Sequence, residues 1–99
     1  MKERDFSTQV TDLLLRFGWH FYGVFEQRSY ARRTMKGFPD RVAWRPATGQ
    51  LIFIELKGTG GELTPDQMIC HAQLRACGQT VLTWWPDDPG LEAMEEVLR

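Results

Sequence analysis

The stretch from Gly37 to Lys57, GFPDRVAWRPATGQLIFIELK, decides the fold of this chain. Its two halves, residues 40–45 and 50–57, have the β-prone side chains of two strands, and the Pro-Ala-Thr-Gly loop between them consists of turn-forming residues. The pattern therefore predicts a hairpin. If Arg45 faces Gln50, antiparallel counting sets three further pairs opposite each other: Trp44 with Leu51, Val42 with Phe53, and Asp40 with Glu55.

This register would gather the charged residues of the hairpin on one face of the sheet. Directly opposed residues have β-carbons about 5 Å apart. Because side chains alternate along a strand, Glu55 and Lys57 would share the face of Asp40, and a slip of one residue would separate them. Residues 51–56 are apolar on both faces, which predicts a central strand covered by helices on both sides.

Asp40, Glu55 and Lys57 together have the composition of a metal-dependent hydrolytic site. Two carboxylates about 5 Å apart repel each other, so a cation must lie between them if both are ionised. Mg²⁺ or Mn²⁺ suits oxygen ligands and bridges to phosphate, while a protonated lysine positions water and stabilises charge on an attacked phosphorus. The structural alternative is a Glu55–Lys57 salt bridge beside a turn aspartate.

Charge is distributed unevenly along the chain, although the formal net charge is only −1. Acidic residues dominate the C-terminal part, whereas Asp40 is the only acid between positions 28 and 45. The basic residues of that segment are Arg28, Arg32, Arg33, Lys36, Arg41 and Arg45. Basic residues next to a carboxylate site predict a polyanionic partner, with Arg28, Arg32, Arg33 and Lys36 as candidate DNA contacts. An ordinary solvated loop is the alternative.

The remaining elements follow from periodicity and capping signals. Helices are predicted over residues 3–17, 65–76 and 91–98, and strands over residues 19–26 and 79–85. Thr64, Pro65 and Gln67 form a capping-box helix start, and Glu3 suits the first turn of a helix as a dipole partner. A chain of 99 residues accommodates one domain, so residues 1–99 are predicted to form a single α/β unit of order α-β-β-β-α-β-α.

Several classes of protein are not expected from this composition. No signal-peptide core and no apolar run of the roughly 20 residues of a membrane span occurs, so we expect no membrane association. Cys70 and Cys77 lie seven residues apart in a predicted helix, about 10 Å, too far for a disulfide. Free thiols indicate a reducing compartment, and a cytoplasmic protein is predicted.

Five ordered blocks of the sequence resemble a known nuclease family. Pro39-Asp40 is separated by 14 residues from Glu55-Leu56-Lys57, which is similar to the PD-(D/E)XK signature. The surrounding blocks resemble the VRR-NUC (virus-type replication-repair nuclease) family more specifically. These blocks are Glu3 with Phe6, Gln9 and Val10; Gly18-Trp19; Gly37 to Asp40; Ile54 to Lys57; and Leu63 to Gln67.

The resemblance implies a PD-(D/E)XK core, a mixed β-sheet flanked by helices, and a role for each matching residue. Asp40 and Glu55 would bind Mg²⁺ or Mn²⁺ together with the carbonyl of Leu56, and Glu3 would bind the metal directly or through water. Lys57 would be the catalytic lysine, and Gln67 would orient the lysine or the water. A helix cap is the alternative role of Gln67. No organic cofactor is implied.

The resemblance also implies a substrate. Short stand-alone members of the family look like phage or mobile-element proteins that form homodimers and cut branched DNA such as four-way (Holliday) junctions. A symmetric dimer would present two sites to a junction. Trp84 and Trp85 are candidates for its interface, with burial in the core as the alternative. Two other functions remain open: a module that binds DNA structures without cutting them, and a nuclease of simple duplex or single-stranded DNA.

Overall fold

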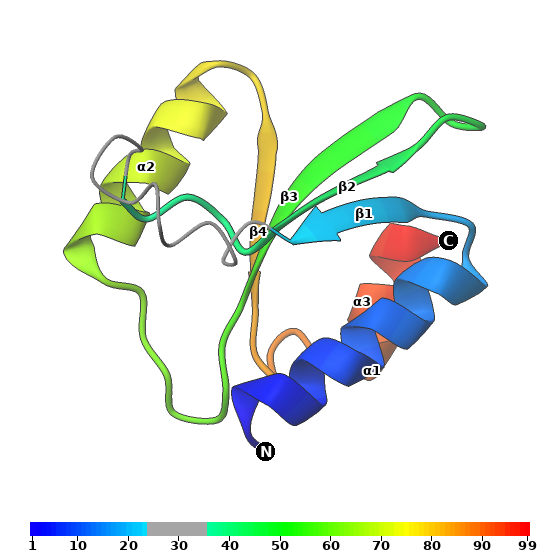
Figure 1. Cartoon of the computed structure of the whole chain (residues 1–99), viewed down its shortest axis with the longest axis horizontal. Coiled ribbons are helices and arrows are strands. Elements are labelled where there is room, and N and C mark those ends of the chain that lie inside the picture. Colours follow the sequence, from blue (N-terminus) through cyan, green and yellow to red (C-terminus); the bar gives the residue numbers. More distant parts are fainter. Residues whose placement is uncertain (24–35) are drawn as a thin grey trace.

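The computed structural model describes residues 1–23 and 36–99 (Figure 1). Its elements occur in the predicted order, and those after residue 36 begin and end within one residue of the prediction. Of the predicted strand 19–26, residues 24–26 lie outside the described part. The elements are α1 (Glu3–Arg16), β1 (His20–Gly23), β2 (Arg41–Arg45), β3 (Gln50–Leu56), α2 (Pro65–Ala76), β4 (Thr80–Trp84) and α3 (Leu91–Leu98).

The four strands form one mixed sheet of order β1-β2-β3-β4. β2 pairs antiparallel with both β1 and β3, whereas β3 and β4 are parallel and are connected through α2. The predicted hairpin register is confirmed, because Arg45 faces Gln50, Trp44 faces Leu51 and Val42 faces Phe53. A mixed sheet flanked by helices, as expected for the PD-(D/E)XK core, is therefore confirmed as the fold.

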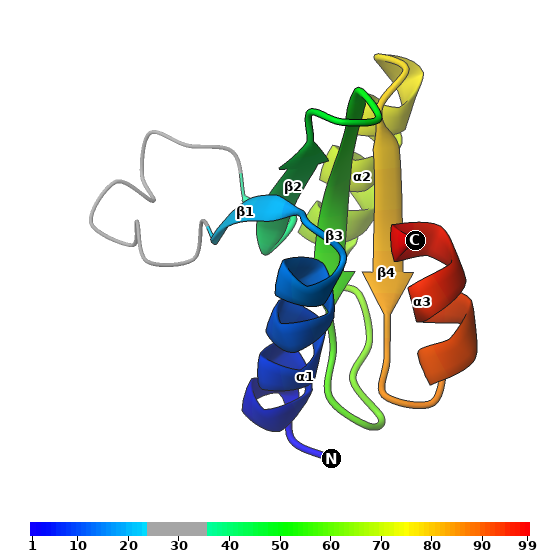
Figure 2. The ribbon, with the colours of Figure 1, turned by 90° about the vertical axis from the view of Figure 1, so that its right-hand side faces the viewer.

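Helices cover both faces of the sheet (Figures 1 and 2). α1 and α3 pack on one face and α2 packs on the other, so β3 lies between them, as predicted for a central strand covered on both sides. The hydrophobic core lies on the α1/α3 face. Its members are Phe6, Val10, Leu13, Leu14, Trp19, Ala43, Ile52, Ile54, Leu56, Trp84, Met94 and Leu98.

The prediction that Arg41 and Arg45 belong to a basic surface is wrong. Residues 41, 43 and 45 alternate with 42 and 44, and this alternation turns both arginines toward α1. Arg41 is buried and donates hydrogen bonds to the carbonyl and hydroxyl oxygens of Ser7. Arg45 donates to the carbonyl oxygens of Phe17 (3.1 Å) and Leu98 (2.7 Å), so it connects the last residues of α1 and α3.

The two candidate interface tryptophans, Trp84 and Trp85, both make contacts within the chain. Trp84 is buried in the core, which is the alternative that its sequence context left open. Trp85 donates its indole N–H to the carbonyl oxygen of Gly61 at 2.6 Å and so holds the segment between β3 and α2. Among the described residues, no helix is both long enough and apolar enough to cross a bilayer.

Candidate active site

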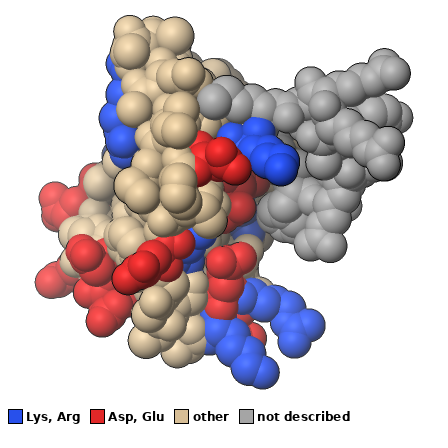
Figure 3. Space-filling view, turned by 90° about the vertical axis from the view of Figure 1, so that its left-hand side faces the viewer, with Lys and Arg blue, Asp and Glu red and all other residues tan. Residues whose placement is uncertain are grey.

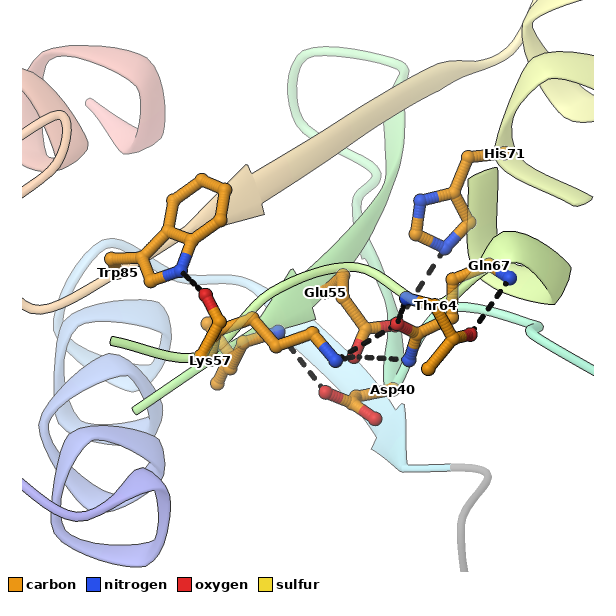
Figure 4. Close-up of polar contacts among 9 residues, drawn as sticks. Asp40, Glu55, Lys57, Thr64, Gln67, His71 and Trp85 are labelled. Atoms are coloured by element: carbon orange, nitrogen blue, oxygen red, sulfur yellow. Dashed lines mark hydrogen bonds and ion pairs between the residues drawn. The ribbon is translucent and has the colours of Figure 1, made fainter. Parts of the chain in front are cut away.

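The polar side chains predicted to carry chemistry meet where β3 ends. Asp40 directly precedes β2, Glu55 is the second-last residue of β3, and Lys57 directly follows β3. Gln67 and His71 come from the first turns of α2, and all five side chains point toward one another (Figure 4). Three segments of the chain, at residues 40, 55–57 and 67–71, therefore form one polar cluster.

Gly37 brings the Asp40 segment against α2. Its φ is +88°, and a β-carbon at this position would lie 2.3 Å from the Asp66 carbonyl oxygen and 2.5 Å from the Gln67 amide nitrogen. Only glycine combines this φ with so close an approach of two backbones. Asp40 then accepts a hydrogen bond from the Leu56 N–H through Oδ2, at 3.0 Å. This contact fixes the Asp40 carboxylate beside Glu55.

Glu55 is the buried centre of the site, with 1% of its surface exposed. The pleat of β3 turns it away from the apolar core and toward α2. Its Oε2 lies 3.3 Å from Nε2 of Gln67, which donates to it, and 3.9 Å from Nζ of Lys57. Its Oε1 lies 3.6 Å from Nε2 of His71 and has no hydrogen-bond partner.

Gln67 makes the contacts of a helix cap and also contacts Lys57 and Glu55. Its Oε1 accepts hydrogen bonds from Nζ of Lys57 (2.8 Å) and from the N–H of Thr64 (2.9 Å). The Gln67 N–H in turn donates to Oγ1 of Thr64 at 3.1 Å, which completes the capping box. Because one side chain caps α2 and contacts both Lys57 and Glu55, the start of α2 is tied to the site.

Burial raises the pKa of Glu55 to about 9, assisted by hydrogen bonding and charge repulsion with Asp40. Lys57 acts in the opposite direction, and Glu3 adds a smaller repulsion. At neutral pH Glu55 therefore keeps a proton, and this proton lets the two carboxylates lie close together. A divalent cation can replace the proton, because carboxylate oxygens are its preferred ligands. The donor set of Asp40 and Glu55 thus fits Mg²⁺ or Mn²⁺.

The other two predicted ligands border this pair. Leu56 ends β3 with its side chain in the core. Glu3 begins α1 and is exposed, and its backbone nitrogen would lie 2.9 Å from a β-carbon at Gly58, so the start of α1 adjoins the residue after Lys57. Within residues 1–23 and 36–99, no three acidic, histidine or cysteine side chains form a metal-binding group. Ligation by Glu3 and by the Leu56 carbonyl stays a prediction.

Of the candidate DNA contacts, only Lys36 lies in the described part of the chain, where it is exposed. Arg28, Arg32 and Arg33 lie outside the described residues. On the α2 side of the molecule, acidic groups gather at the lower left, whereas basic groups lie at the upper left, beside the centre and at the lower right (Figure 3).

The sequence interpretation missed His71. It is completely buried, and burial lowers the pKa of its imidazole. A signal for it exists, because Gln67 and His71 are four residues apart in a helix and so project from the same side. If Gln67 lies at the site, this spacing predicts that His71 lies there too.

A model of the VRR-NUC domain matches residues 20–83, which is more than half of the chain. None of the curated proteins matches. Among solved structures, the chain is similar to one described as the crystal structure of paFAN1 bound to 2nt 5'flap DNA with gap. The identity is 27% and the TM-score is 0.43, over 50% of this chain and 10% of that one. The chain thus spans about a tenth of the length of paFAN1.

Proposed function

The chain belongs to the VRR-NUC domain family, and from this membership we propose that it is a divalent-metal-dependent DNA endonuclease. The observation that supports the proposal most strongly is the convergence of Asp40, Glu55 and Lys57 at the end of β3, next to Gln67. The free thiols of Cys70 and Cys77 suit a protein of the reducing cytoplasm, where we place it.

Asp40 and Glu55 are the proposed metal ligands, with the Leu56 carbonyl and Glu3 completing the set directly or through water. A bound Mg²⁺ or Mn²⁺ would supply Lewis acidity toward the phosphodiester and positive charge for its transition state. The hydrogen bond from the Leu56 N–H holds Asp40 in place for this task, and Gln67 holds Oε2 of Glu55.

Lys57 is the proposed catalytic lysine. An ammonium group has three N–H donors, and one of them is given to Oε1 of Gln67 at 2.8 Å. The side chain keeps 12% of its surface exposed, so its head group can meet a phosphate or a water at the molecular surface. Its charge would then stabilise the negative charge that develops on the attacked phosphate.

The substrate that we propose is branched DNA such as a four-way junction, cut by a homodimer. Lys36 is exposed, and with Arg28, Arg32 and Arg33 it would hold the phosphate backbone. A fold of this size has little surface with which to recognise a junction. Two sites related by a two-fold axis would match the symmetry of such a substrate.

A panel of labelled DNA tests the proposal directly. Four-way junction, linear duplex and single strand are incubated with the protein in Mg²⁺, in Mn²⁺ or in EDTA, and light scattering reports the oligomeric state. We expect metal-dependent nicks in the junction, which Lys57→Ala and Glu55→Ala abolish while circular dichroism shows that both variants remain folded. Unchanged cleavage by both variants would contradict the assignment.

The other outcomes of the panel separate the remaining functions. Binding of the junction without cleavage in either metal would favour a module that only recognises DNA structure. Equal cleavage of linear DNA by a monomer would support the nuclease activity but contradict both the junction preference and the homodimer.

A further inference from the structure

The proposed reaction gives no task to His71, a buried polar side chain of α2. The imidazole has 0% of its surface exposed, and neither ring nitrogen makes a well-formed hydrogen bond, although the Gly37 backbone lies beside the ring. Buried polar side chains are nearly always hydrogen-bonded, so an imidazole in this position requires an explanation. The ionisable group that lies 3.6 Å from Nε2 is Glu55, whose Oε1 also lacks a hydrogen-bond partner.

Helix α2 presents two side chains to Glu55, one for each carboxylate oxygen. Gln67 donates to Oε2 at 3.3 Å, and Nε2 of His71 lies 3.6 Å from Oε1 (Figure 4). The two residues are one helical turn apart, so they reach the carboxylate from the same side. A separation of 3.6 Å is slightly longer than a hydrogen bond, and because both atoms are buried, no bulk water is available to either.

We infer that His71 is a positioning residue for Glu55: its Nε2–H donates to Oε1 and, with Gln67 on Oε2, fixes the plane of the carboxylate that holds the metal ion. The inference rests on the proposed function, because it needs Glu55 to be a ligand. A ligand that is held at both oxygens does not have to be ordered when the ion arrives. Groups that orient metal ligands in this way commonly change metal affinity by about 10- to 100-fold.

Metal binding by four forms of the full chain provides the first test. Calorimetry measures the Kd for Mn²⁺ alone, without DNA, in the wild type, His71→Leu, His71→Gln and Cys70→Ala. Leucine fills the space without a donor, whereas the glutamine amide can place an N–H near the position of Nε2. Cys70 is the matched control, because it is buried on the same helix next to His71.

We expect His71→Leu to weaken Mn²⁺ binding about 10-fold or more and His71→Gln to recover most of that loss. Cys70→Ala should bind like the wild type even if it unfolds at a lower temperature. Equal Mn²⁺ affinity in His71→Leu and the wild type would overturn the inference, as would an equal loss in Cys70→Ala. A wild type that does not bind Mn²⁺ would instead contradict the metal site of the proposed function.

A spectroscopic test does not depend on any variant. The chain has two histidines, and exposed His20 serves as an internal reference for His71. Nitrogen-15 spectra recorded with and without Mg²⁺ should show His71 as the Nε2–H tautomer in the metal-bound protein, with the signals of His20 unchanged. A His71 ring that carries its proton on Nδ1 in the presence of saturating Mg²⁺ would overturn the inference. This result can be obtained with the wild type even if His71→Leu fails to fold.

Discussion

The two faces of strand β3 use burial in opposite ways. Toward α1 and α3 the strand presents Ile52, Ile54 and Leu56, which all lie in the hydrophobic core. Its other face presents Leu51, Phe53 and Glu55, and Glu55 is the most deeply buried of these three. The alternation of the pleat turns Glu55 away from the core residues, so neighbouring residues of one strand serve stability and the proposed chemistry.

This contrast shows how a chain of 99 residues can offset the cost of burying Glu55. Burial of the apolar side chains removes hydrocarbon surface from water and stabilises the fold. Burial of the polar groups of Glu55 and His71 removes them from water and costs free energy, because they lack well-formed hydrogen bonds. The α1/α3 face therefore offsets what the α2 face loses, and the α2 face keeps the carboxylate that we propose as a metal ligand.

The largest stability effect is expected on the apolar face. Leu14 of α1 is completely buried in the core, so Leu14→Ala should lower the free energy of unfolding by about 2–5 kcal/mol. Its neighbour Leu15 is 62% exposed, and Leu15→Ala should change stability by less than about 0.5 kcal/mol. Urea denaturation measures both. If the two faces are independent, Leu14→Ala keeps its Mn²⁺ affinity at temperatures where it is folded.

A slightly smaller effect is expected where the Asp40 segment meets α2. Gly37→Ala should destabilise the protein by about 2–4 kcal/mol, because it combines a positive φ with a collision against the Asp66 backbone. Gly78 is a matched control, since its φ is +81° and nothing lies within 4 Å of the added carbon. Gly78→Ala should cost about 1 kcal/mol by denaturation.

Only the Gly37 variant should also weaken metal binding, since it displaces α2 relative to Asp40. Equal losses of stability in the two glycine variants would mean that the close approach of the backbones contributes nothing.

The fold was predictable because its signals are local. Capping residues begin α2 at Pro65, a run of β-prone residues marks β3, and a short loop fixes the register of the hairpin. From that register the neighbourhood of Asp40, Glu55 and Lys57 followed by counting alone. The remaining parts of the site depend on where α2 lies, and this is set by a contact between Gly37 and Asp66 that no sequence spacing encodes.

The same limit explains the errors about charge. From the sequence, Arg45 is predicted to be a surface cation. In the structure its guanidinium lies 4.7 Å from the centre of the Trp19 ring and donates to the carbonyl oxygen of Leu98, the last residue of α3. A long side chain can bury its charged end against aromatic rings and carbonyl oxygens that come from distant segments. The density of basic residues along a chain therefore overestimates the basic surface.

The pH dependence of stability should distinguish the Glu55 face of β3 from its apolar face. The pKa of Glu55 is raised by burial to about 9, from an ordinary value of 4.5. The folded state thus holds this proton more tightly than the unfolded state, and stability declines as pH rises through that interval. One such group lowers the free energy of unfolding by at most about 1.4 kcal/mol per pH unit. Denaturation in EDTA at pH 6 and pH 8 measures the decline.

Two controls assign the pH effect to this carboxyl group. Glu55→Gln has no proton to lose and should remove most of the decline between pH 6 and pH 8. Saturating Mg²⁺ should also reduce the decline in the wild type, because the cation replaces the proton between Asp40 and Glu55. A decline of equal size in Glu55→Gln would place its origin in other groups.

The smallest expected change in stability concerns Gln67. The comparison decides whether Gln67 only caps α2 or also takes part in cleavage. Thr64→Ala and Gln67→Ala each break the reciprocal hydrogen bonds of the capping box, so each should cost about 1 kcal/mol of stability. Only Gln67→Ala also removes the contacts with Lys57 and Glu55. It should therefore slow cleavage by about 10-fold or more, whereas Thr64→Ala should cut like the wild type. Single-turnover cleavage below the unfolding temperature of both variants makes the comparison, and equal rates in the two would reduce Gln67 to a helix cap.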